Sequence, residues 1–153
     1  MTIRPLAAGE AAALATRLAE LPLLRRYRRQ AADLARDLDG AGARGEVVLV
    51  HDAGADGPDG VAWFSPSGTF LLGGYLKLLA VAPGTEGRGI GRELLAAFEA
   101  EVGRVSRHAF LLVSDFNQGA QRFYERHGFS RVGALPDLVL AGVSEVVYWK
   151  RLG

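Results

Sequence analysis

The spacing of apolar residues in the N-terminal part of the chain predicts two helices. Apolar positions recur every three or four residues over 11–21 and again over 24–38, which is the pattern of helices that bury one face. Pro22 is expected to end the first helix, and the second stops before Gly40 and Gly42.

The strand pattern fills most of the remaining chain. Short apolar runs with β-branched and aromatic residues are bounded by Gly, Pro and Asp, which is typical of strands separated by turns. Gly73 and Gly74 are expected to break or bulge this pattern, and the Gly- and Asp-rich stretch 52–59 is expected to be a turn. The predicted strands are residues 2–6, 46–51, 60–64, about 70–72, 75–81, 108–114, 129–135 and 143–149.

Two further amphipathic helices are predicted in the C-terminal half, at residues 92–104 and directly after Asn117. The resulting order is β-α-α-β-β-β-α-β-α-β-β. No repeat, linker or change of composition divides the chain, so we expect residues 1–153 to form a single domain of mixed α/β (α+β) class.

Composition removes several classes of partner and site. The net charge of +1 provides no broad field for nucleic acid or an anionic membrane. The absence of cysteine excludes disulfides, a thiol nucleophile and thiolate metal ligands. The three histidines are scattered in sequence, so no metal site is predicted. No apolar run approaches the length of a membrane span and the N-terminus does not read as a signal peptide, so a cytoplasmic protein is expected.

A glycine-dense turn lies between the predicted strand 75–81 and the next helix. Gly87, Gly89 and Gly91 alternate with larger residues, and without Cβ atoms the backbone there can approach a ligand closely. Successive N–H groups in such a turn, with the positive end of the following helix, favour a phosphate. No lysine is present for a P-loop, and Arg92 stands where a dinucleotide fingerprint needs glycine. The alternative is a plain strand-to-helix connection.

A second segment is a helix with clear signals at both ends. Asn117 is a good N-cap residue, and Gly128 is suited to end the helix. The residues at helical spacing on one face are Ala120, Phe123, Tyr124 and His127. The alternative interpretation is a capped amphipathic helix in which Tyr124 belongs only to the core.

Together the two segments resemble the signatures of the GNAT superfamily of acyl-CoA-dependent N-acyltransferases. Residues 86–91 match the coenzyme A pyrophosphate loop, Arg/Gln-x-x-Gly-x-Gly/Ala, except that Glu86 replaces the cationic or amide residue. Residues 117–129 match Asn-x-x-Ala-x-x-Phe-Tyr-x-x-x-Gly-Phe. The resemblance implies a mixed, mostly antiparallel sheet of about six or seven strands, flanked by about four helices.

The resemblance also implies acetyl-CoA as acyl donor and direct transfer to a primary amine in a ternary complex. Tyr124 matches the tyrosine that protonates the departing thiolate, and a backbone N–H at Val81 or Ala80 would stabilise the oxyanion. The Glu86 side chain should turn away from the pyrophosphate. The residues implied to bind the cofactor are Leu79, Ala80, Val81, Glu86, Gly87, Arg88, Gly89, Ile90, Gly91, Arg92, Asn117, Ala120 and Phe123.

The acceptor side has no equally clear signal. The candidates for the general base that removes the amine proton are Tyr75, Asp115 and a water held by Ser114. The acceptor is expected to be an amine of a small molecule or of a peptide. An arginine cluster on the second predicted helix is either a site for an acidic acceptor or a solvated face: Arg25, Arg26, Arg28 and Arg29. Two functions follow, an N-acetyltransferase or a GNAT-like module that binds coenzyme A without turnover. A homodimer is compatible with both.

Overall fold

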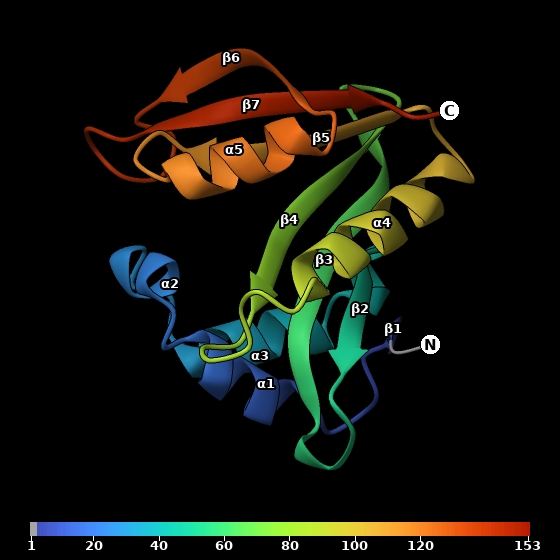
Figure 1. Ribbon diagram of the computed structural model, residues 1–153, viewed down its shortest axis with the longest axis vertical. Coiled ribbons are helices and arrows are strands. Elements are labelled where there is room, and N and C mark those ends of the chain that lie inside the picture. The colour runs from blue at the N-terminus through green and yellow to red at the C-terminus, as the bar shows by residue number, and fades with distance from the viewer. Residues whose placement is uncertain (1–2) are drawn as a thin grey trace.

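A single seven-stranded sheet organises the chain, in the order β1-β2-β3-β4-β5-β7-β6 (Figure 1). The computed structural model describes residues 3–153, so Thr2 of the first predicted strand lies outside the described residues. Among the paired strands of residues 3–153, only β4 and β5 are parallel. The strands are β1 (Ile3–Pro5), β2 (Val47–Asp52), β3 (Pro58–Thr69), β4 (Gly73–Val81), β5 (His108–Ser114), β6 (Ser130–Pro136) and β7 (Ser144–Arg151). The helices are α1 (Ala11–Leu18), α2 (Pro22–Arg26), α3 (Ala31–Asp39), α4 (Ile90–Gly103) and α5 (Gln118–Arg126).

Helices cover both faces of the sheet, because alternate strand residues are apolar in both directions. On β3, Val61 and Trp63 pack with α1 and α3 in one buried cluster. Their neighbours Ala62 and Phe64 pack with α4 in a second cluster, which also reaches α5 and β7. The prediction of a mixed, mostly antiparallel sheet between helices is therefore confirmed.

The sheet opens between its two parallel strands. β4 and β5 pair only from Gly74 to Leu76 on β4. The register between β3 and β4 shifts next to Leu76, which leaves Lys77 as an extra residue in β4. Beyond this bulge β4 stays with β3 as far as Val81, whereas β5 continues along β7 as far as Ser114. The two strands consequently diverge (Figure 1).

The predicted helix over 24–38 is wrong as a continuous element. The chain forms α2, then turns through Arg28, whose φ is +55°, and restarts as α3. Leu24 and Leu34 nevertheless enter the same buried cluster, so the apolar spacing persists across the break and hides it. Pro22 likewise begins α2, whereas it was expected to end the preceding helix, and α1 already ends at Leu18.

The predicted strand at 70–72 is also wrong, because these residues form the turn between β3 and β4. Phe70 and Leu71 have φ of +46° and +80°, and both side chains are exposed. Gly73 and Gly74 do not break β4, because both belong to it, but the pairing with β3 is irregular beside them: the register shifts between Ser65 and Thr69. A Cβ on Gly74 would lie 2.4 Å from Val102 of α4, so glycine is needed there for close packing. Smaller differences are an earlier start of α4, at Ile90, and a short 3-10 helix, Gly54–Asp56, within the predicted turn.

Candidate active site

The glycine loop places two left-handed residues directly before α4. Gly87 and Gly89 have φ of +80° and +77°, a region that costs other residues about 1–2 kcal/mol. Gly89 is the N-cap of the helix, so the free N–H groups of its first turn follow at once. Gly91 differs, since a Cβ there would be in ordinary contact, 3.7 Å from Phe123. Backbone conformation therefore requires glycine at two of the three predicted positions.

Charged side chains surround this loop without neutralising one another. Arg88 and Arg92 are exposed, and neither forms an ion pair with any other of residues 3–153. Glu86 folds back, so that its Oε2 accepts a hydrogen bond of 3.0 Å from the N–H of Gly84. The side chain of Ile90, in contrast, is buried in the core, so only its backbone can serve a ligand.

The backbone of β4 offers polar groups to the gap. The N–H of Ala82 donates to Asp59 on β3, and N–H and C=O groups alternate between the two edges of a strand. Ala80 therefore directs its N–H and C=O toward β3, whereas Leu79 and Val81 direct theirs toward the diverging β5. Of the two candidate oxyanion donors, Val81 is the one oriented to the gap.

Helix α5 closes the gap from the other strand. Asn117 caps it as predicted, because its Oδ1 accepts a hydrogen bond of 3.1 Å from the N–H of Ala120. Phe123 lies beside Gly91 and thereby joins the first turn of α4 to α5. Asn117 and Ala120 both line a cavity of about 280 Å³ that lies where β4 and β5 part.

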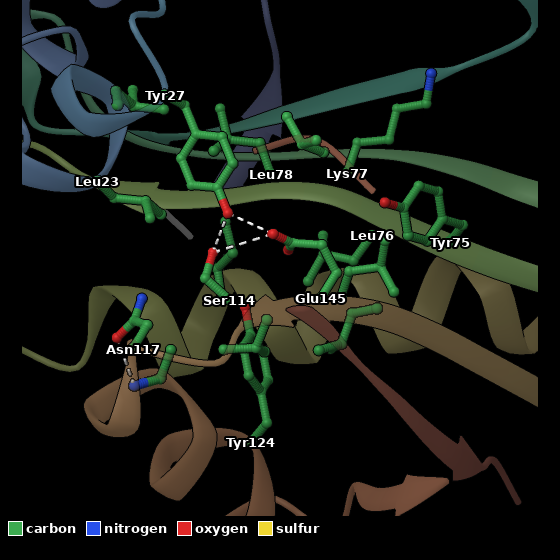
Figure 2. Close-up of a pocket in the computed structure, with 17 residues that line it drawn as sticks. Leu23, Tyr27, Tyr75, Leu76, Lys77, Leu78, Ser114, Asn117, Tyr124 and Glu145 are labelled. Carbon is green, nitrogen blue, oxygen red and sulfur yellow. Dashed lines mark hydrogen bonds between the residues drawn. The ribbon is translucent and has the colours of Figure 1, made fainter. Parts of the chain in front are cut away.

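Tyr124 is both a core residue and a cavity residue. Its ring packs edge-on against Phe123 and Phe129, and the side chain is 8% exposed. It rises from α5 toward the cavity that it lines (Figure 2). The Tyr124 hydroxyl forms no hydrogen bond with any of residues 3–153. Every fully buried side-chain oxygen in this range does have a hydrogen-bond partner, so the Tyr124 hydroxyl is not fully buried and retains access to the cavity. Burial raises the pKa of Tyr124, which keeps the hydroxyl protonated.

The cavity also contains three side chains that the sequence did not bring together. Tyr27, at the end of α2, makes short hydrogen bonds with Ser114 of β5 and with Oε2 of Glu145 on β7 (Figure 2). Ser114 Oγ lies 3.5 Å from the same carboxylate oxygen. Glu145 is 6% exposed. Burial, and then the hydrogen bond with Glu145, raise the pKa of Tyr27, so Tyr27 remains a donor.

The three proposed bases have different positions. Ser114 lines the cavity. Tyr75 lines it too, but burial and the nearby charge of Glu145 raise its pKa, which makes it a poor base at neutral pH. Asp115 is exposed and accepts a hydrogen bond from the N–H of Ser144, outside the cavity. Sequence reasoning missed Glu145, whose only signal was a carboxylate within the apolar run 143–149.

The three histidines lie apart from one another in sequence, and each of them contacts different neighbours outside the cavity. His51 contacts Asp59 and Glu93, His108 contacts Trp149, and His127 contacts the carbonyl of Phe123. Residues 3–153 contain no group of three or more side chains arranged to hold a metal ion. Among the helices of this described range, none has both the length and the apolar character that crossing a membrane requires.

Comparison with known proteins agrees with this geometry. A GNAT-family protein from Desulfovibrio desulfuricans has a similar structure, with a TM-score of 0.81 and 25% identity over 99% of this chain and 98% of that one. An aminoglycoside 6'-N-acetyltransferase complexed with coenzyme A has a TM-score of 0.76 and 19% sequence identity, and the match covers 99% of this chain and 97% of that one. The ribosomal-protein-alanine N-acetyltransferase from Brucella melitensis has a TM-score of 0.77 and 20% sequence identity, and the match covers 99% of this chain and 100% of that one.

Sequence comparison identifies the family. No curated protein matches the chain closely enough to be reported as a relative. Residues 43–131, more than half of the chain, match the family model of the acetyltransferase (GNAT) domain. The chain therefore belongs to the GNAT family of acetyltransferases.

Proposed function

We propose that this protein transfers the acetyl group of acetyl-CoA to a primary amine while both substrates occupy the gap between β4 and β5. The observation that carries the proposal is the divergence of the two strands after Leu76. It leaves the backbone of Leu79 and Val81 directed toward the gap, where Leu79 and, from the other side, Tyr124 line the cavity.

The cofactor would lie along this opening. The amides of the pantetheine arm would pair with Leu79 and Val81 as an additional strand, as peptides do at sheet edges. The pyrophosphate would then meet the free N–H groups at Gly87, Gly89 and the first turn of α4. Arg88 and Arg92 are exposed beside this loop and would add positive charge.

The residues at the gap would supply the chemistry of the thioester. The amine attacks the thioester carbonyl, and the N–H of Val81 stabilises the oxyanion that forms. Tyr124 donates its proton to the sulfur as the carbon–sulfur bond breaks. Holding both substrates in attacking geometry supplies the largest part of the rate, about 7–11 kcal/mol.

The test has two stages, binding and turnover. Calorimetry with acetyl-CoA should show one site per chain, and thiol release should then be followed with a panel of primary amines. Because similar structures bear the names of aminoglycoside and ribosomal-protein-alanine acetyltransferases, the panel includes an aminoglycoside and a peptide with N-terminal alanine, besides simple alkylamines. Binding without release for any amine would instead favour the coenzyme A-binding module, and absence of binding would contradict both.

A further inference from the structure

Glu145 is a buried carboxylate without a cationic partner in the part of the chain that the structure describes. Both hydroxyls near it, those of Tyr27 and Ser114, contact the same oxygen, Oε2. No hydrogen bond joins Oε1 to any of residues 3–153, and no fully buried side-chain oxygen of this range lacks a partner. Oε1 is therefore not fully buried, and the Glu145 side chain lines the cavity. An ionised carboxylate in an apolar site is costly unless a cation pairs with it.

The charge balance of the cavity favours a cation. Its lining includes one basic and one acidic side chain, those of Lys77 and Glu145. Lys77 extends away from the cavity in Figure 2, and its Nζ binds Glu46 Oε2 at 2.5 Å. Glu145 is consequently the charge that an entering molecule meets. The other titratable groups facing it are Tyr27 from α2, Tyr75 from β4 and Tyr124 from α5.

We infer that Glu145 binds the ammonium group of the acceptor and takes its proton, with Tyr27 and Ser114 as positioning residues. The acceptors are then cationic primary amines whose amino group is attached to a small apolar group. This inference rests on the proposed acetyl transfer and adds to it the proton acceptor and the substrate class.

The proton balance of the reaction needs such a group. The amine arrives as R–NH3⁺, and one proton passes to Glu145 and later to solvent. The neutral nitrogen attacks the thioester carbon, and the carbon–sulfur bond then breaks. The sulfur takes the proton of the Tyr124 hydroxyl, and Tyr124 recovers one from the nitrogen as the amide forms. The products are R–NH–CO–CH3, coenzyme A as the thiol, and one proton in solvent.

The apolar part of the cavity lining determines which substituent of the acceptor can bear the amino group. Leu23 and Leu24 of α2, Leu78 of β4 and Val139 enclose the same cavity as Glu145. The alternative of an acidic acceptor, held by the arginines of α2 and of the turn that follows it, has weak support from the structure. Arg26 lies over the ring of Phe116, 3.5 Å from its centre, and Arg29 pairs with Asp37. These two guanidinium groups are already occupied.

The decisive experiment compares two amines of similar size in the wild type and in Glu145→Gln. Ethylamine is cationic at neutral pH, whereas 2,2,2-trifluoroethylamine is largely neutral there. For ethylamine, kcat/KM should fall by about 10²- to 10⁴-fold in Glu145→Gln, the range of general acid–base residues. For trifluoroethylamine the same substitution should change kcat/KM by less than about tenfold, because no proton needs to be removed first. Acetyl-CoA affinity should be unchanged.

Controls separate this inference from the proposed function and from loss of structure. Glu125→Gln alters another carboxylate that accepts a tyrosine hydroxyl, that of Tyr148, outside the cavity, and should leave both amines unaffected. In Tyr27→Phe, kcat/KM should fall more for ethylamine than for trifluoroethylamine, because a hydrogen bond that orients the Glu145 carboxylate is lost. A merely structural role of Tyr27 would lower kcat/KM equally for both amines.

The outcomes are distinguishable. If the wild type binds acetyl-CoA but acetylates no amine of the panel, the proposed function and this inference fail together. If the wild type acetylates ethylamine and Glu145→Gln does so equally well, the inference fails alone. An equal loss for both amines would also overturn it, since it would show that Glu145 does not act through the proton.

Discussion

The two sides of the gap are built in different ways. The cofactor side consists of two continuous segments, the stretch from Leu79 to Gly91 and the helix capped by Asn117, and it offers mainly backbone groups. The acceptor side offers side chains and brings together Tyr27, Ser114 and Glu145, although Tyr27 is separated from its two partners by 87 and 118 positions in the sequence. A site made of local backbone geometry leaves a pattern in the sequence, whereas one assembled by the sheet leaves almost none.

Tyr124 stands between the two sides, and removal of its hydroxyl should lower turnover while leaving acetyl-CoA binding unchanged. Tyr124→Phe keeps the ring that packs against Phe123 and Phe129 but removes the proton donor. Because a thiolate is a tolerable leaving group, kcat should fall by about 10²-fold, the low end for a general acid. Calorimetry should show unchanged acetyl-CoA affinity. Wild-type kcat in this variant would remove Tyr124 from the mechanism.

The same variant checks the burial of Tyr124. Since burial raises its pKa in the folded state, the unfolded chain loses the phenolic proton first, at about pH 10. Stability is therefore fully present below about pH 10 and falls as pH rises further. Thermal unfolding at alkaline pH should show a shallower fall for Tyr124→Phe than for the wild type. Parallel curves would mean that the hydroxyl is exposed.

On the cofactor side, the backbone of the loop should matter more than any of its side chains. In Gly89→Ala the φ of +77° becomes strained by about 1–2 kcal/mol, so acetyl-CoA affinity should fall by about 5- to 30-fold. Gly91→Ala makes the same chemical change two residues later, where a Cβ meets only ordinary contacts, and should bind normally. Equal affinity of both variants in calorimetry would contradict the assignment of the loop.

The smallest expected effect concerns the departure from the family signature at position 86. Glu86→Gln keeps an acceptor for the N–H of Gly84 but removes a negative charge from the loop. Acetyl-CoA binding should tighten by about two- to fivefold, as for an exposed charge interaction of up to about 1 kcal/mol. The gain should shrink at high salt. Weaker binding would show that the carboxylate has a role of its own in holding the loop.

What the sequence could predict follows the same division. Asn117 and Gly89 act within one or two turns of chain, so their roles as N-cap and as left-handed residue can be recognised locally. Tyr27 was assigned to a continuous helix because the apolar spacing continues from Leu24 to Leu34 across the turn at Arg28. The position of Glu145 in the cavity cannot be recognised locally, because it depends on the strand register that pairs Glu145 with Ser114, 31 residues away.

The exposed turn at Phe70 and Leu71 was missed for a related physical reason. Apolar residues next to a predicted strand favour a strand, but both residues adopt positive φ, which no local pattern of large apolar residues predicts. Close packing of Gly74 on Val102 likewise depends on where α4 crosses the sheet. Such contacts depend on tertiary structure and leave no local trace.

The most direct test of the central claim is a crystal structure of the protein with coenzyme A. We predict that the pantetheine amides hydrogen-bond to the backbone of Leu79 and Val81, and that the sulfur lies within hydrogen-bond distance of the Tyr124 hydroxyl. The cavity lined by Glu145 should remain open beside the sulfur for the amine. A coenzyme A molecule bound elsewhere, or with its sulfur away from Tyr124 and Glu145, would contradict the account.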